Sequence, residues 1–268
     1  MTVLGLRKGT VVIGAIAGDI IGSRFEGDRS PPKAFDLFHP LCGFTDDTVC
    51  TLAIAEALLT RRDFAKSLRK YVRRYPERGY GSLFLEWGLD PKEPPYGSWG
   101  NGAPMRVAAV GWLASDEGEA LELAAAQSVV SHDHPEAIAA SQAVALAILL
   151  LRRGEGVRAV RKRISAQFGY DLRQRAAFAE GGFDVSAIGT TPAALTAAFI
   201  STNWEEAVRK AISLGGDTDT MACIAGAVAE AMHGVPDAIA NEARAYLTPD
   251  LAKVLLSFER ALTRQEIK

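Results

Sequence analysis

The chain has 268 residues, of which 48% are hydrophobic and 23% charged, and its formal net charge at pH 7 is −2. This length and composition are enough to bury one sizeable core. The slightly acidic balance gives no global attraction to nucleic acid or to anionic membranes, so either partner would need a local basic patch.

The three cysteines, Cys42, Cys50 and Cys223, are odd in number and contain no CxxC pair. This argues against a disulfide framework and a thiolate zinc site, and we expect a cytoplasmic protein. The N-terminus lacks a basic-then-apolar signal pattern. The apolar stretch 137–151 is shorter than the ~18 residues of a membrane span, so we predict a buried helix there and no membrane contact.

Helical periodicity and abundant alanine predict an all-α fold. No linker, internal repeat or composition boundary divides the sequence, so we predict a single domain over residues 1–268. In chain order, the predicted helices cover roughly residues 12–22, 46–60, 63–74, 104–115, 119–129, 135–152, 156–167, 192–200, 204–214, 219–233 and 248–264. The glycines and prolines of residues 88–103 exclude a continuous helix. A long loop inside a compact domain is more often functional than idle.

The first predicted helix carries Gly14, Gly18 and Gly22 on one face, a spacing typical of close helix packing. The second begins after Thr45, a plausible N-cap, with Asp46 and Asp47 in its first turn. Acidic residues there complement the helix dipole, so capping alone is a sufficient explanation for either aspartate.

The basic stretch 61–74 reads as an amphipathic helix with a solvated cationic face, and a contact with a phosphate backbone is the alternative. The later run Gly100-Asn101-Gly102 precedes a predicted helix start near Pro104. Its glycines would turn backbone N–H groups towards an anion, to which the helix would add its positive end; a tight structural turn is the alternative.

His132 and His134 precede the predicted helix 135–152. Their spacing suggests zinc, but no suitable third ligand lies nearby in the sequence. We therefore expect His132 to be a hydrogen-bonding group that lines a cleft.

The helix predicted over 219–233 repeats the pattern at 45–48, because Asp217, Asp219 and Thr220 lie at its start. Capping needs one such group per helix. If the two helix starts meet, four carboxylates converge, and their repulsion is severe unless cations neutralise them. Hard oxygen ligands select magnesium, manganese or calcium over zinc, and a pair of cations would suit this site. Glu26 is then either a solvated loop charge or a polar group beside the metals.

Six segments, read in order, resemble the ADP-ribosylglycohydrolase family, which includes the dinitrogenase-reductase-activating glycohydrolases. They are GDIIGSRFE, FTDDTVCTLAIAEALL, SWGNGAPMRVAAVGWL, SHDHPEAIAASQAVALAI, FGYDL and ISLGGDTDTMACIAGAVAEA, and they span about Gly14 to Gly234. The resemblance implies a compact, orthogonal all-helical bundle that holds two Mg²⁺ or Mn²⁺ ions in a cleft for ADP-ribose.

The resemblance also implies roles for individual residues. The metal ligands would be Thr45, Asp46, Asp47, Asp217, Asp219 and Thr220. Glu26 falls where the family has an acidic residue at the metal site, and Glu26, Asp47 or Asp219 would accept the proton of an attacking water. Gly100, Asn101 and Gly102 match the loop that holds the diphosphate, and His132 matches a residue near the nucleotide.

The expected activity is hydrolysis of ADP-ribose from a modified macromolecule, with protein arginine the commonest type among such relatives. Serine, nucleic acid and small-ester linkages stay open, as do a non-catalytic ADP-ribose binder and a phosphoesterase that releases AMP. The sequence departs from the family pattern at Pro104, which removes a backbone donor, and at Ala187-Ile188, where relatives often carry Cys-Gln.

Overall fold

The computed structural model describes residues 11–60, 62–178 and 184–266. Within these ranges the chain forms α-helices, one short 3-10 helix and no β-strand, which confirms the predicted all-α class. The helices are α1 (Ile13–Gly22), α2 (Asp46–Leu59), α3 (Phe64–Arg74), α4 (Ser82–Leu89), α5 (Ala108–Leu113), α6 (Glu117–Ser128), α7 (Pro135–Arg152), α8 (Val157–Phe168), α9 (Gln174–Ala177), α10 (Ala187–Phe199), α11 (Trp204–Ile212), α12 (Thr218–His233), α13 (Asp237–Ala245) and α14 (Pro249–Glu266), with the 3-10 turn η1 at Ser23–Phe25.

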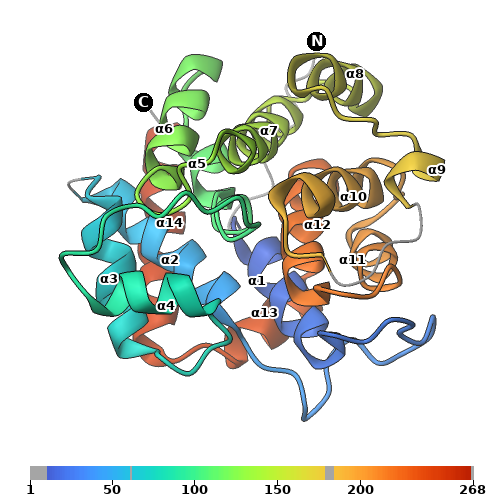
Figure 1. Ribbon diagram of the computed structural model, residues 1–268. Coiled ribbons are helices and arrows are strands. Elements are labelled where there is room, and N and C mark those ends of the chain that lie inside the picture. Colours follow the sequence, from blue (N-terminus) through green and yellow to red (C-terminus); the bar gives the residue numbers. More distant parts are fainter. Residues whose placement is uncertain (1–10, 61, 179–183, 267–268) are drawn as a thin grey trace.

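Helices α1 and α12 form the centre of the fold, where they lie side by side (Figure 1). Every residue of α1 is buried. A Cβ added at Gly18 would lie 2.1 Å from the carbonyl oxygen of Ala222, and one at Gly22 would lie 2.4 Å from that of Thr218. The backbones of the two helices are therefore in direct contact, which confirms that the glycine spacing in α1 serves close packing.

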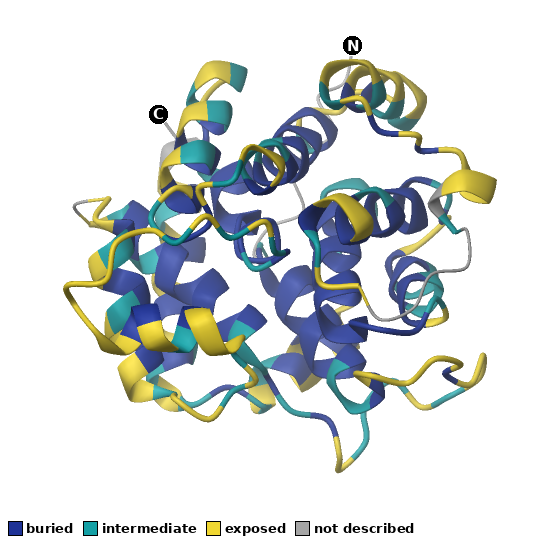
Figure 2. Cartoon of the chain, viewed as in Figure 1, coloured by how far each residue is buried: buried dark blue, intermediate teal, exposed yellow. Residues whose placement is uncertain are grey.

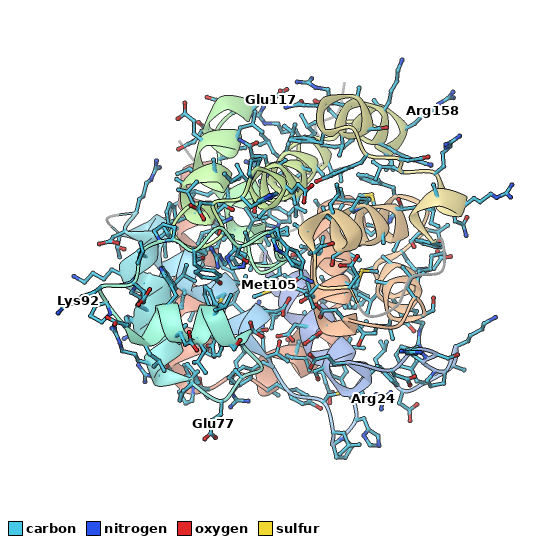
Figure 3. All side chains as sticks on the ribbon, viewed as in Figure 1. Arg24, Glu77, Lys92, Met105, Glu117 and Arg158 are labelled. Atoms are coloured by element: carbon cyan, nitrogen blue, oxygen red, sulfur yellow. The ribbon has the colours of Figure 1, made fainter. Side chains whose placement is uncertain are left out.

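Among the helices in the described part of the chain, one, α7, is long and apolar enough to cross a membrane. However, 67% of these 18 residues are buried inside the protein, where the helix packs against α5, α6, α8, α10 and α12. Figure 2 shows the same pattern, with buried residues concentrated in the central helices. Charged side chains such as Lys92 and Arg158 lie at the periphery, whereas Met105 lies near the centre (Figure 3).

Two predicted helix starts were wrong. Helix α5 begins at Ala108 rather than near Pro104, because residues 101–106 form consecutive turns. Helix α10 begins at Ala187 rather than at Pro192, because the Ser186 side chain caps it by accepting a hydrogen bond from the Gly189 amide at 3.0 Å. Helices α4 and α13 and the single-turn helix α9 were not predicted at all.

Candidate active site

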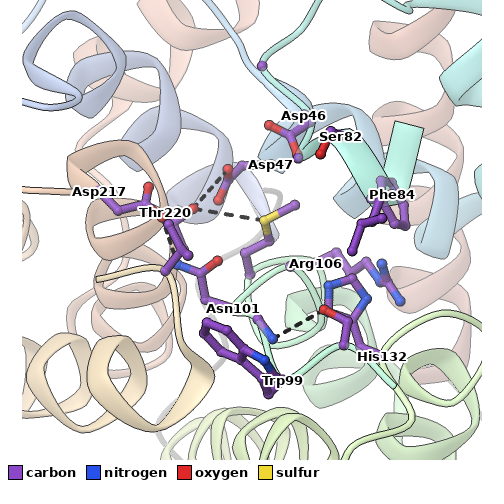
Figure 4. Close-up of a pocket in the computed structure, with 18 of the residues that line it drawn as sticks. Asp46, Asp47, Ser82, Phe84, Trp99, Asn101, Arg106, His132, Asp217 and Thr220 are labelled. Atoms are coloured by element: carbon purple, nitrogen blue, oxygen red, sulfur yellow. Dashed lines mark hydrogen bonds between the residues drawn. The ribbon is translucent and has the colours of Figure 1, made fainter. Parts of the chain in front are cut away.

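The two acidic helix starts meet in space. The hydroxyl of Thr220, on α12, donates to Oδ2 of Asp47, on α2, at 3.2 Å. Asp46, Asp47, Asp217, Asp219, Thr220 and Glu26 line one cavity of about 490 Å³. Figure 4 shows Asp46 and Asp47 on one side of this cavity and Asp217 with Thr220 on another. Four aspartates from two distant segments therefore converge, as the metal hypothesis requires.

The carboxylates form two groups that share one member. Asp19, Asp47 and Asp219 make one group, and Glu26, Asp217 and Asp219 make the other; within each group the possible ligand oxygens lie within 4.8 Å of one another. Oδ1 of Asp47 is buried and has no hydrogen-bond partner among the described residues. An unpaired carboxylate oxygen facing further carboxylates suits a hard divalent cation, so the donor set fits Mg²⁺ or Mn²⁺.

Burial and mutual repulsion perturb these groups strongly. Burial raises the pKa of Asp47 well above its usual value, and the charges of Asp19 and Asp46 raise it further. Burial also raises the pKa of Asp219, and the charges of Asp47 and Asp217 raise it further. The pKa of Glu26 is raised by burial and then by Asp217. Protons or cations must therefore compensate this cluster when the protein is folded.

Asp19 is the important residue that the sequence analysis missed. It is fully buried in α1, and its carboxylate accepts from the amides of Thr45 and Thr48 at 3.0 and 3.1 Å. The hydroxyls of both threonines donate to it as well. Burial raises the pKa of Asp19 to about 6, against the lowering effect of these hydrogen bonds. A lone carboxylate inside an apolar helix was the available signal, because a buried acid needs several donors.

Two of the predicted ligands lie at the edge of the cluster. Thr45 is the N-cap of α2, as predicted, and its hydroxyl donates to Asp19 at 2.7 Å. It is not among the described residues that line the cavity. Asp46 lines the cavity but belongs to neither close carboxylate group, and its amide donates to the carbonyl of Arg78 at 2.7 Å. Their role as ligands stays a prediction.

Gly100, Asn101 and Gly102 line the same cavity as the carboxylates. The amide of Gly100 donates to the Ser98 hydroxyl at 3.2 Å and that of Asn101 to the carbonyl of Val185 at 2.8 Å, so these two donors are engaged within the protein. The Asn101 side chain donates to Oδ2 of Asp217 at 2.7 Å. The expected contribution of a helix end at Pro104 is absent, because α5 begins four residues later. Asn101 thus ties the glycine loop to the acidic cluster.

His132 is buried and lines the cavity, as the sequence analysis expected. Its ring lies 5.7 Å from that of Phe84 and 5.9 Å from that of Tyr96. A Cβ added at Gly102 would lie only 2.8 Å from Nε2 of His132, so a side chain there would displace the imidazole. Burial and the nearby Arg106 lower the pKa of His132 well below its usual value, which keeps the ring neutral.

The family departure at Ala187-Ile188 lies beside the cavity. Ala187 is buried, and its amide donates to the carbonyl of Trp99 at 2.9 Å. Ile188 is 49% exposed and Trp99 is 51% exposed. The departure therefore puts an exposed apolar side chain directly after a residue whose backbone is bonded to Trp99, which lines the cavity.

Comparison with known proteins assigns this architecture to a family. The family model described as ADP-ribosylglycohydrolase matches residues 8–266. The chain is similar to ADP-ribosylhydrolase ARH3 of Gallus gallus, at 26% identity over 82% of this chain and 83% of the relative. It is also similar to the ADP-ribosyl-[dinitrogen reductase] glycohydrolase of Rhodospirillum rubrum, at 25% identity over 82% of this chain and 76% of the relative.

A solved structure titled as an ADP-ribosylglycohydrolase-related protein complex superposes with a TM-score of 0.73 and 27% identity, covering 93% of this chain and 95% of the other. The chain therefore belongs to the ADP-ribosylglycohydrolase family and is a glycosidic-bond hydrolase that acts on ADP-ribosylated substrates.

Proposed function

We propose that the enzyme is a Mg²⁺-dependent hydrolase, with Mn²⁺ as a substitute, that releases ADP-ribose from arginine side chains of proteins. The observation that carries the metal requirement is the pair of carboxylate groups that share Asp219. Two cations would be held by Asp46, Asp47, Asp217, Asp219 and Thr220, with Thr45 at the edge and Glu26 beside them. Bound Mg²⁺ would supply Lewis-acid chemistry and lower the pKa of a water.

The protein side chains supply orientation and a proton acceptor. Asn101 holds Asp217 in place, while Gly100, Gly102 and His132 line the same cavity and would contact the diphosphate. Glu26, Asp47 and Asp219 are candidate acceptors for the proton of the attacking water. Of these, Glu26 is the exposed one, so it is best placed to reach a water that enters from solvent.

Two observations support an arginine-linked protein substrate. The exposed carboxylate of Glu26 lies at the cavity and would attract the cationic guanidinium of the leaving arginine, which a serine linkage lacks. The relative from Rhodospirillum rubrum is named for a protein carrier, dinitrogen reductase. Serine, nucleic acid and small-ester linkages remain the competing substrates.

The test is incubation of the full chain with ADP-ribosylated arginine and serine peptides and ADP-ribosylated DNA, with products identified by mass spectrometry. We expect free ADP-ribose from the arginine peptide, loss of turnover in EDTA, and recovery on adding Mg²⁺ or Mn²⁺. Release of AMP would identify a phosphoesterase instead. Turnover of the serine peptide or DNA but not of the arginine peptide would overturn the linkage assignment, and undiminished turnover in EDTA would overturn the metal requirement.

A further inference from the structure

Arg106 is a fully buried cation in the wall of the cavity. Its Nε donates to Oε1 of Gln127 at 2.7 Å, and its Nη2 donates to the carbonyl of Gln127 at 2.8 Å and to the hydroxyl of Ser131 at 3.1 Å. Among the described residues Arg106 forms no ion pair, and its Nη1 is buried without an acceptor. The guanidinium is thus held by neutral groups alone, and its charge is not balanced by a bonded carboxylate.

The hydrogen bonds beyond Arg106 have a fixed direction. A guanidinium only donates, so the Ser131 oxygen accepts from Arg106 and its own hydrogen must be directed elsewhere. The other partner of this hydroxyl among the described residues is Nδ1 of His132, at 2.9 Å. Ser131 is fully buried, and leaving its hydrogen unpaired would be costly. Ser131 therefore donates to Nδ1, and a neutral His132 must carry its proton on Nε2.

That Nε2 faces the glycine loop. It would lie 2.8 Å from a Cβ at Gly102 and 3.7 Å from a Cβ at Gly100, and both glycines line the cavity. Figure 4 shows His132 and Arg106 together on one wall, across the cavity from Asp217 and Thr220. The Nε2–H group thus lies beside the two glycines, on a wall of the cavity that the ring and the loop both line.

We propose that Arg106 and Ser131 are positioning residues that fix His132 as the Nε2–H tautomer, so that it donates a hydrogen bond to the substrate diphosphate. The unpaired charge of Arg106 adds attraction for the same anion. This inference rests on the proposed function, because the diphosphate belongs to the ADP-ribose substrate. The tautomer itself is a property of the ligand-free protein and is tested separately.

The first measurement is long-range ¹H–¹⁵N NMR of the full chain labelled at histidine. The protein has four histidines, and a His132→Gln variant assigns the signal. We expect His132 to show the neutral Nε2–H pattern throughout about pH 6 to 8. Ser131→Ala should remove this fixed pattern. Ser128→Ala is the matched control, because Ser128 is equally buried and donates to the carbonyl of His132, at 2.8 Å, rather than to its ring.

The second measurement is calorimetric binding of ADP-ribose in the presence of Mg²⁺. Ser131→Ala should weaken binding about tenfold, as expected for loss of one hydrogen bond to a charged group, while Ser128→Ala should not. Adenosine, which lacks the diphosphate, should bind both variants equally. An Nδ1–H or doubly protonated His132 in the unaltered protein would overturn the proposal that Arg106 and Ser131 fix the tautomer. An Nε2–H ring in a protein that binds no ADP-ribose would overturn the diphosphate assignment and the proposed function, but not the tautomer.

Discussion

Asp219 is the residue on which both carboxylate groups depend. It shares one group with Asp19 and Asp47 and the other with Glu26 and Asp217. Removing its charge would therefore impair both cation positions at once. The same change would also relieve repulsion in the metal-free protein, because burial and its acidic neighbours raise the pKa of Asp219. Function and metal-free stability are thus expected to respond in opposite directions.

We predict that Asp219→Ala lowers turnover of the ADP-ribosylated arginine peptide at least about a hundredfold. Circular dichroism should show an unchanged helical content, and the metal-free variant should be no less stable than the unaltered protein at pH 8. Asp237→Asn is the control, because Asp237 is an exposed aspartate in the first turn of α13. A fully active Asp219→Ala variant would remove the role assigned to this residue.

At the scale of the helix, α2 is positioned by a cap from another element. Asp19 of α1 accepts from the amide of Thr48, 29 residues away in sequence, and so fixes the start of α2 against α1. We predict that Asp19→Ala lowers the free energy of unfolding by about 3 kcal/mol, because several donors at the start of α2 lose their acceptor.

The comparison is Asp63→Ala, which removes an exposed N-cap of α3 that accepts from the amide of Lys66 at 3.0 Å. This loss should cost about 1 kcal/mol, as is usual for such caps. Urea denaturation of both variants measures the difference. Equal destabilisation would mean that the buried cap contributes no more than a surface one.

The contact between α1 and α12 makes a second prediction at this scale. Gly18→Ala would place a Cβ 2.1 Å from the carbonyl oxygen of Ala222 and force the helices apart. We expect destabilisation of roughly 3 kcal/mol, although alanine by itself favours helix over glycine. Gly43→Ala is the matched control, because nothing lies within 4 Å of its Cβ position. Similar thermal midpoints for the two variants would contradict the close packing.

For the whole molecule, the buried carboxylates couple stability to pH and to cations. A group whose pKa is raised on folding holds its proton more tightly in the folded state, and this stabilisation disappears as pH rises through the folded pKa. Burial raises the pKa of Asp19 from 3.8 to about 6. We predict that the metal-free protein loses on the order of 1 kcal/mol of stability between about pH 5 and pH 8 as Asp19 ionises.

Saturating Mg²⁺ should reduce this loss, because it binds the ionised carboxylates of the folded protein. Urea denaturation in EDTA and in Mg²⁺, across this pH range, measures both effects. Potassium chloride at the same ionic strength controls for screening. Stability that stays constant or rises with pH in EDTA would show that the acidic cluster does not impose the expected cost.

The sequence by itself determined the helical class, the glycine contact face and the two acidic helix starts, because periodicity, small residues and capping act over a few neighbouring positions. It failed for α4, which contains Gly88 and aromatic residues of weak helix preference and is stabilised by burial of Phe84 and Trp87. It also failed for α13, a short and mostly polar helix in which only Ile239, Ala240 and Ala243 are buried.

Only the tertiary structure decided how the site is assembled. Thr220 and Asp47 are 173 residues apart, and Asn101 and Asp217 are 116 apart, yet each pair is hydrogen-bonded. Asp19 likewise became a cap for α2 through packing and not through local sequence. Local preferences indicate where helices begin, but which helix starts come together depends on how their apolar faces pack, and this depends on the whole chain at once.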